Sequence, residues 1–220
     1  MSNDAYLTIR TTSQGLYKDK GSKFIASAHP VQSEEEVEQR LEAIRQEHPK
    51  ARHYCYAYKI GFDGDRFRLH DDGEPSGTAG RPIYGRIEAL DLTNVLVVVV
   101  RYYGGTKLGT SGLANAYKAA AEDALNGADI IKKYRQNIYE LELPYEYFGS
   151  AMEALKSRDA KILNQEFEDR PYLRISLPRS SGRAIISSAL AEIYSAPDLT
   201  WEQIPERTTA DVSERDEPQR

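Results

Sequence analysis

Apolar and polar residues alternate with a period of two along several stretches of the first half of the chain. This alternation predicts strands at 6–12, 23–31, 52–61 and 66–70. Asp63-Gly64 is a turn signal that joins the last two of these strands as a hairpin. A different pattern marks 95–100, a continuous run of mostly β-branched apolar residues. Such a run is typical of a strand covered on both faces, so we expect this strand to be buried.

Helical spacing of apolar residues marks three further stretches, two between these strands and one after the last. Ser33 and Glu36 fit the capping-box pattern at the start of the first helix, which Pro49 ends. Pro82 can open the second helix at its first position. The third helix is expected over 112–126, directly after a glycine-rich loop. The first 134 residues therefore predict one domain that mixes strands and helices.

The second half has its own pattern, in the order βαββαβ. Its elements are expected at 137–143, 147–157, 160–167, 172–177, 180–194 and 199–204. This order is that of a ferredoxin-like sandwich. The stretch 132–135 is polar and is interpreted as the link between the domains. We thus expect an α+β protein with domains at 1–134 and 135–205, and a charged tail at 206–220 that is disordered.

Charge and composition narrow the classes of function. The 220 residues carry a net charge of −5, but 1–134 is neutral and 135–220 holds the whole excess. No broad basic field is present to hold nucleic acid nonspecifically, so any RNA contact must be local. The single cysteine excludes an intramolecular disulfide. No secretory signal is recognised and no apolar run is long enough for a bilayer, so a cytoplasmic protein without membrane contact is expected.

The stretch 101–112, RYYGGTKLGTSG, is the strongest candidate site. It lies between the buried strand and a helix and holds four glycines. Glycines allow backbone N–H groups to converge, and a helix N-terminus favours an anion. The residues expected to bind a phosphate are Arg101, Gly104, Gly105, Lys107, Gly109 and Thr110. The Walker A spacing is absent, and the alternative is a tight connection that needs glycine only for steric reasons.

A second loop, DDGEPSGTAGRP at 71–82, is acidic. Its candidate binding residues are Asp71, Asp72, Glu74 and Thr78. Three carboxylates in four positions can bind a cation, transfer protons or hold a cationic partner. Taken singly, these residues are more typical of turns that satisfy nearby backbone N–H groups. The spacing of a calcium loop is absent, and no metal is predicted.

His53, Cys55 and Ala57 form a third motif, because strand alternation places them on one face. A His–Cys pair can be nucleophilic or can supply two zinc ligands. The sequence has no second cysteine to complete a zinc site. We therefore interpret Cys55 as a buried or half-buried strand residue rather than a nucleophile.

These three motifs together resemble the YigZ/IMPACT family over essentially the whole first domain. The resemblance implies that this domain has the fold of the second domain of ribosomal protein S-five, and that the second domain is ferredoxin-like. In eukaryotic relatives the family domain belongs to a translation regulator, and bacterial members have been suggested to bind nucleic acid or ribosomes. The family brings no established reaction or cofactor. Tyr103 and Asn115 depart from the usual Phe and Arg.

The resulting hypothesis is a binding protein linked to translation regulation that contacts RNA, the ribosome or a translation factor through the glycine-rich loop. We expect the two loops to line one crevice, with Asp71 or Asp72 near Arg101 or Lys107. Such a crevice also leaves open an enzyme that acts on a phosphorylated small molecule or nucleotide. A third alternative is a pure protein-interaction module that docks a regulatory protein.

Overall fold

The computed structural model describes residues 4–62, 65–167, 169–191, 193 and 200–203, with only the backbone at 200–203. These residues divide into two compact units. The first is Tyr6–Lys133, and the second combines Asp4 and Ala5 with the described residues from Tyr134 onward. Each unit has its own hydrophobic core, so each is described by itself.

The first unit is built on a five-stranded sheet in which every neighbouring pair is antiparallel. The strands, in the order β2-β3-β6-β4-β5, are β2 (Ser13–Asp19), β3 (Ser22–Pro30), β6 (Val95–Tyr102), β4 (His53–Ile60) and β5 (Arg66–His70). The central strand β6 pairs with β3 and β4 on its two sides. Its register sets Arg101 opposite both Phe24 and His53, at one end of the sheet.

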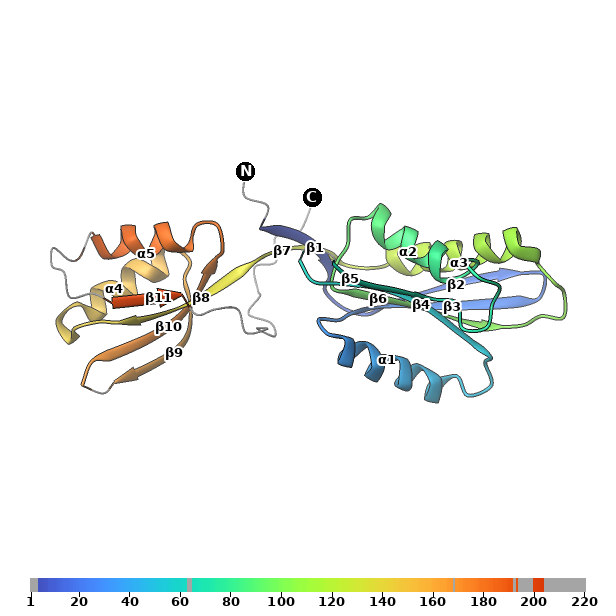
Figure 1. Ribbon diagram of the computed structural model, residues 1–220, viewed down its shortest axis with the longest axis horizontal. Coiled ribbons are helices and arrows are strands. Elements are labelled where there is room, and N and C mark those ends of the chain that lie inside the picture. The colour runs from blue at the N-terminus through green and yellow to red at the C-terminus, as the bar shows by residue number, and fades with distance from the viewer. Residues whose placement is uncertain (1–3, 63–64, 168, 192, 194–199, 204–220) are drawn as a thin grey trace. The chain divides into compact units, whose positions relative to one another are not determined.

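Helices cover both faces of this sheet, as Figure 1 shows, with α1 (Glu34–Glu47) on one face and α2 (Gly80–Ala89) and α3 (Gly109–Asn126) on the other. Alternate side chains of β6 enter two different cores. Val97 and Val99 pack in the core that holds α2 and α3, and Val98 and Val100 pack in the core that holds α1. The continuous apolar run at 95–100 is therefore buried, and that prediction is confirmed.

The helix starts refine what the sequence predicts. Ser33 Oγ accepts a hydrogen bond from the Glu36 N–H, while the Glu36 carboxylate accepts one from the N–H of Gln32 rather than that of Ser33. The second helix begins at Gly80, so the expectation that Pro82 is its first residue is wrong. The third helix begins at Gly109, three residues earlier than expected, and takes in the end of the glycine-rich loop.

Two strands, β7 and β2, were not predicted from the sequence. The first of them, β7 (Ile130–Tyr134), pairs with β1 (Ala5–Ile9), the strand predicted at 6–12, in a two-stranded sheet. The stretch 132–135 does contain the division between the two units, as expected, but most of it belongs to β7. The second missed strand, β2, lies against α3. A Cβ at Gly15 would lie 2.3 Å from the backbone nitrogen of Ala124, so glycine permits this approach.

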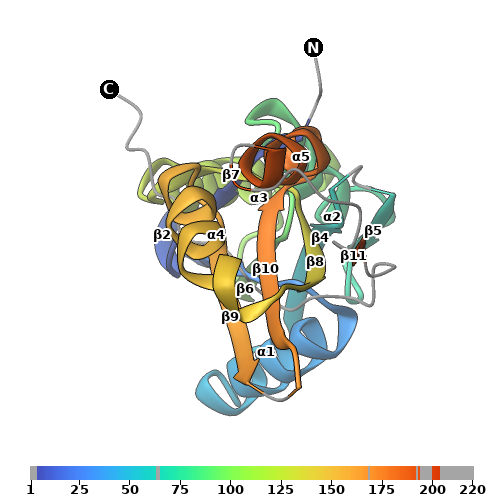
Figure 2. The ribbon, with the colours of Figure 1, turned by 90° about the vertical axis from the view of Figure 1, so that its left-hand side faces the viewer.

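The second unit is a four-stranded antiparallel sheet in the order β11-β8-β10-β9, with helices α4 and α5 packed against it (Figure 2). Its elements are β8 (Gln136–Glu142), α4 (Tyr145–Ser157), β9 (Lys161–Phe167), β10 (Pro171–Pro178), α5 (Gly182–Ala191) and β11 (Thr200–Gln203). This is the ferredoxin-like βαββαβ arrangement, and the α+β fold class is confirmed. The predicted tail at 206–220 lies outside the described residues. No helix in the described part of the chain is long and apolar enough to cross a membrane.

Candidate functional site

The glycine-rich loop and the acidic loop meet at the end of the sheet where β6 stops and β4 begins. Arg101, the last but one residue of β6, donates a hydrogen bond from Nη1 to Glu74 Oε1 at 2.5 Å. The side chains of Arg101 and Glu74 are only 7% and 4% exposed. The hydroxyl of Tyr117, on α3, donates to the same Glu74 oxygen at 2.8 Å. A buried ion pair, held by a third residue, therefore joins the two loops.

This geometry corrects the expected pairing. Glu74, rather than Asp71 or Asp72, meets Arg101, and Lys107 forms no ion pair with any described residue. The Arg101 charge is thus compensated inside the protein and is not exposed for a ligand. Removing one partner of a buried pair typically costs about 3–5 kcal/mol, so this contact has a structural role in the site.

Asp71 organises the acidic loop. Its Oδ1 accepts hydrogen bonds from the N–H groups of Ala79 and Gly80, and its Oδ2 accepts one from Gly77. Burial raises the pKa of Asp71, but the three backbone donors outweigh burial and the net pKa is lowered. Asp71 is therefore a charged residue that holds the loop backbone at the start of α2.

Asp72 and Thr78 also bind the backbone. Asp72 Oδ2 accepts from the N–H of Tyr54 at 2.7 Å, and Thr78 Oγ1 donates to the Pro75 carbonyl at 2.6 Å. The carbonyl oxygen of Asp72 lies 2.9 Å from His53 Nδ1, and since a carbonyl can only accept, the proton is on Nδ1. Asp71 and Asp72 thus both satisfy nearby backbone N–H groups, which is the alternative that the sequence offered for this loop. No group of three His, Cys, Asp or Glu side chains in the described parts of the chain is placed to hold a metal ion.

Cys55 lies beneath these loops and is fully buried, as predicted. Its thiol donates to the Asp71 carbonyl at 3.0 Å, and Sγ lies 3.3 Å from the hydroxyl oxygen of Tyr117. Burial raises the pKa of the Cys55 thiol, and the neighbouring carboxylates of Glu74, Asp72 and Asp71 raise it further. A thiol in this setting stays protonated at neutral pH and is a poor nucleophile.

Gly104 fastens the glycine-rich loop to the turn between β2 and β3. Its N–H donates to Ser22 Oγ at 3.1 Å, and an added Cβ would lie 1.9 Å from the carbonyl carbon of Gly21. The steric alternative therefore explains this glycine, and its amide is already occupied rather than available to an anion. Gly105 and Gly109 have φ angles of +87° and +74°, which strain other residues.

The rest of the glycine-rich loop is open to solvent. Lys107 and Thr110 are exposed, and Lys107 stands two residues before the first residue of α3. The N-cap residue Leu108 provides no side-chain hydrogen bond, and the first turn of α3 has no acidic residue. The first N–H groups of a helix have no partner within it, so this terminus carries partial positive charge beside an exposed lysine.

Two aromatic residues that the sequence analysis did not assign to the site complete it. The Arg101 guanidinium lies over the ring of Phe24 at 5.4 Å and over the ring of Tyr103 at 5.5 Å from the centroid. Together with Tyr117, these residues surround the ion pair. The sequence did contain a signal for Tyr117. It lies on the apolar face of the predicted helix, and a buried tyrosine hydroxyl usually needs a polar partner.

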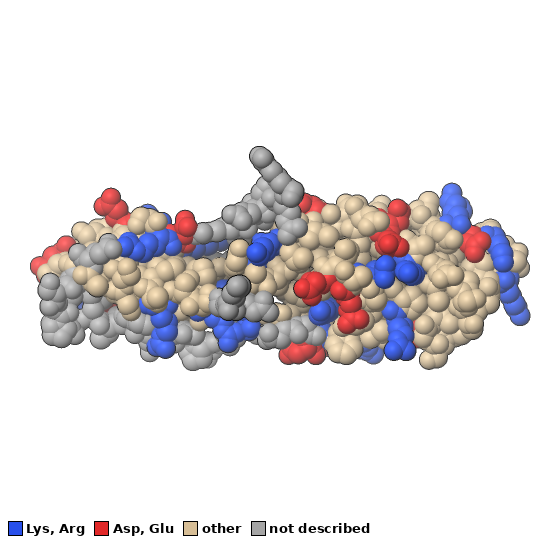
Figure 3. All heavy atoms as spheres, turned by 90° about the horizontal axis from the view of Figure 1, so that it is seen from above, with Lys and Arg blue, Asp and Glu red and all other residues tan. Residues whose placement is uncertain are grey.

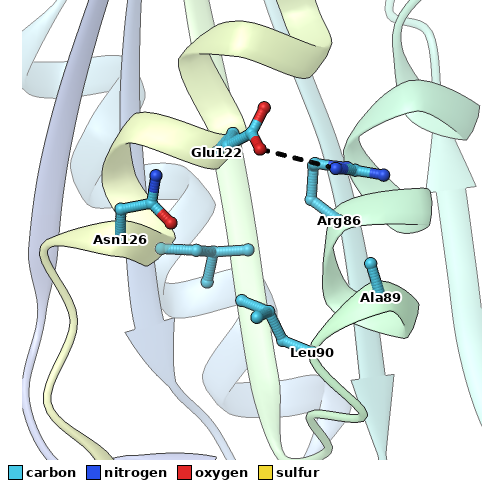
Figure 4. Close-up of a pocket in the computed structure, with 6 residues that line it drawn as sticks. Arg86, Ala89, Leu90, Glu122 and Asn126 are labelled. Carbon is cyan, nitrogen blue, oxygen red and sulfur yellow. Dashed lines mark ion pairs between the residues drawn. The ribbon is translucent and has the colours of Figure 1, made fainter.

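A separate hollow lies between α2 and α3 (Figure 4), where Arg86 Nη1 and Glu122 Oε1 are 3.6 Å apart. It is lined by Arg86, Ala89, Leu90, Glu122, Leu125 and Asn126. Its volume of about 50 Å³ is far below the several hundred Å³ typical of small-molecule sites. On the face that carries α2 and α3, basic and acidic side chains are interspersed (Figure 3).

Comparisons with known proteins agree with this architecture. Residues 20–125 match the family model described as the Impact N-terminal domain. The chain is 36% identical to the Escherichia coli IMPACT family member YigZ over 161 residues, which are 72% of this chain and 79% of that protein. It is 32% identical to the Bacillus subtilis IMPACT family member YvyE over 74% of each chain.

A solved structure described as that of a hypothetical protein extends the likeness to both units. It has a TM-score of 0.70 and 32% identity, and the match covers 93% of this chain and 99% of that one. The similarity to the two bacterial relatives likewise spans most of each protein. The chain belongs to the IMPACT family.

Proposed function

We propose that this protein is a binding protein of the translation apparatus that holds a phosphate group of RNA at the start of α3. The observation that carries this proposal is the position of Lys107. It is exposed, it has no ion-pair partner among the described residues, and it directly precedes an uncapped helix N-terminus. A cation and a set of unpartnered N–H groups on one short segment are the elements of an anion site.

The electrostatics of the site favour a local contact. Glu74 neutralises Arg101, so among the residues predicted for the site the free positive charge comes from Lys107, to which the helix terminus adds a partial charge. Thr110, in the first turn of α3, adds an exposed hydroxyl. Figure 3 shows acidic and basic side chains interspersed on the face that carries α2 and α3, so we expect binding to engage few phosphates and to have a shallow salt dependence.

The link to translation rests on family membership. The family domain belongs to a translation regulator in eukaryotes. A protein that acts in translation meets ribosomal RNA, whose backbone offers phosphates to the site. The enzyme alternative receives no support from the loop carboxylates, because Asp71 and Asp72 accept backbone N–H groups and Glu74 pairs with Arg101.

Co-sedimentation with ribosomes and binding to short RNA test the proposal. Lys107→Ala is compared with Lys118→Ala, which removes an exposed lysine within α3. A charged hydrogen bond is worth about 1.5–3 kcal/mol, so Lys107→Ala should weaken binding by roughly ten- to a hundred-fold. Lys118→Ala should bind as the unmodified protein does. Equal binding by all three proteins would overturn the proposal.

A further inference from the structure

We infer that Tyr103 is a stacking platform for an unpaired nucleobase, so that the site takes single-stranded rather than duplex RNA; this inference rests on the proposed function. Tyr103 is 57% exposed, directly after the last residue of β6 and four residues before Lys107. One short segment thus presents an aromatic ring and a cation, which match the base and the phosphate of a nucleotide.

The ring of Tyr103 is supported from inside the protein. The Arg101 guanidinium lies over it at 5.5 Å from the centroid and lies over the buried ring of Phe24 at 5.4 Å. An arginine and an aromatic ring in this geometry attract each other through the ring quadrupole. One face of Tyr103 is therefore held by Arg101, and the exposed remainder is available to a ligand.

The support is itself fixed. Glu74 accepts hydrogen bonds from both Arg101 and Tyr117, and all three side chains are buried. Immediately after Tyr103, the Gly104 N–H is bound to Ser22 Oγ. A ring whose backbone and inner face are both anchored loses little conformational freedom when a base stacks on it. On this inference, the buried ion pair of Arg101 and Glu74 serves to position Tyr103.

The surroundings of Tyr103 favour a base over an apolar protein surface. The residues that follow it are Gly104, Gly105, Thr106 and Lys107, which offer no further large apolar side chain. The hot spots of protein interfaces are clusters of large side chains packed in desolvated pockets. An aromatic ring and a cation on one short exposed segment are instead the elements with which proteins bind single-stranded nucleic acid. Bases in a duplex are already stacked on each other and are not open to such a ring.

Fluorescence anisotropy with a labelled short oligoadenylate tests this inference. Three variants are needed: Tyr103→Ala, Tyr103→Phe and, as a matched control, Tyr145→Ala. Tyr145 belongs to the other unit and is also 57% exposed. Base–aromatic stacking predicts that Tyr103→Ala weakens binding by about 5- to 150-fold. Tyr103→Phe should keep most of the affinity, and Tyr145→Ala should keep all of it. Circular dichroism confirms that each variant is folded.

An oligomer of the same length with abasic sites, and a duplex, separate the two proposals. The unmodified protein should bind both more weakly than oligoadenylate, and Tyr103→Ala should have no further effect on the abasic oligomer. If Lys107→Ala weakens binding but Tyr103→Ala does not, or if duplex and single strand bind alike, the stacking inference is overturned and the phosphate site stands. If no RNA is bound at all, both proposals fail.

Discussion

Glu74 and Arg101 lie 27 residues apart in the sequence and form an ion pair that solvent barely reaches. The pair joins the acidic loop before α2 to the end of the central strand β6. Two motifs that are separate in the sequence are therefore one structural unit, and the chemistry of either loop depends on the other.

Glu74→Gln should destabilise the protein strongly. The substitution keeps the size of the side chain but leaves the Arg101 charge buried without its counter-charge, which should lower the free energy of unfolding by about 3–5 kcal/mol. Denaturant titration measures the change. The double variant Glu74→Leu, Arg101→Met removes both charges and should lose less than Glu74→Gln. A double variant that is less stable than Glu74→Gln would contradict this account.

Gly104→Ala should destabilise the first unit, because its new Cβ would meet the backbone of Gly21. Overpacking of this kind costs about 1–3 kcal/mol. Gly85, on α2, has no atom within 4 Å of an added Cβ and serves as the matched control. Gly85→Ala should raise the free energy of unfolding by about 0.4–1 kcal/mol. Thermal unfolding of both variants checks this: the melting temperature should fall for Gly104→Ala and rise for Gly85→Ala. Equal shifts of the two melting temperatures would show that the contact at Gly104 is unimportant.

His29 should make stability depend on pH. The pKa of His29 is lowered from 6.5 to about 4, chiefly by burial and next by the Arg40 charge, against an opposing effect of Glu47. Because the folded pKa lies below the unfolded one, the stabilisation is present above pH 6.5 and is lost as pH falls towards 4. The loss amounts to about 3 kcal/mol.

Two measurements check the His29 prediction. Nuclear magnetic resonance should find the His29 ring neutral at pH 5.5, where an unperturbed histidine is mostly charged. Denaturant titration should find that His29→Gln loses less stability than the unmodified protein between pH 6.5 and 4. A ring that titrates near 6.5 would refute the prediction.

We also expect the domain boundary near 134 to separate two independently folding parts. A fragment of residues 1–134 retains both β1 and β7 and should unfold cooperatively. A fragment of residues 1–129 removes β7 and leaves β1 without its partner, so it should be less stable. Circular dichroism and denaturant titration of both fragments measure this. If 1–134 does not fold alone, the boundary is misplaced.

Local patterns were sufficient for much of the fold. The run at 95–100 identified the buried strand because every residue in it meets a core on one face or the other. The order of elements in the second unit followed from alternation and helical spacing. In contrast, β2 carries few apolar residues and lies against α3, while β7 is short, with Lys132 and Lys133 after its two isoleucines, and pairs with β1.

The site was only partly predictable, for a related reason. The sequence offers three carboxylates within four positions, and alternation cannot tell which of them reaches a strand 27 residues away. Asp71 is used by three backbone N–H groups that become neighbours only when the loop folds. Tyr117 looks like any core residue of a helix until its hydroxyl is seen to meet Glu74.

The central position of β6 has a consequence for the lifetime of the site. Its neighbours β3 and β4 bind it on both edges, and helices shield it on both faces. Amides in such a strand exchange with solvent only when the whole unit opens, whereas binding loops commonly open on their own. Arg101 belongs to that strand, so the support beneath Tyr103 should persist as long as the folded unit itself, and hydrogen exchange there should report global unfolding.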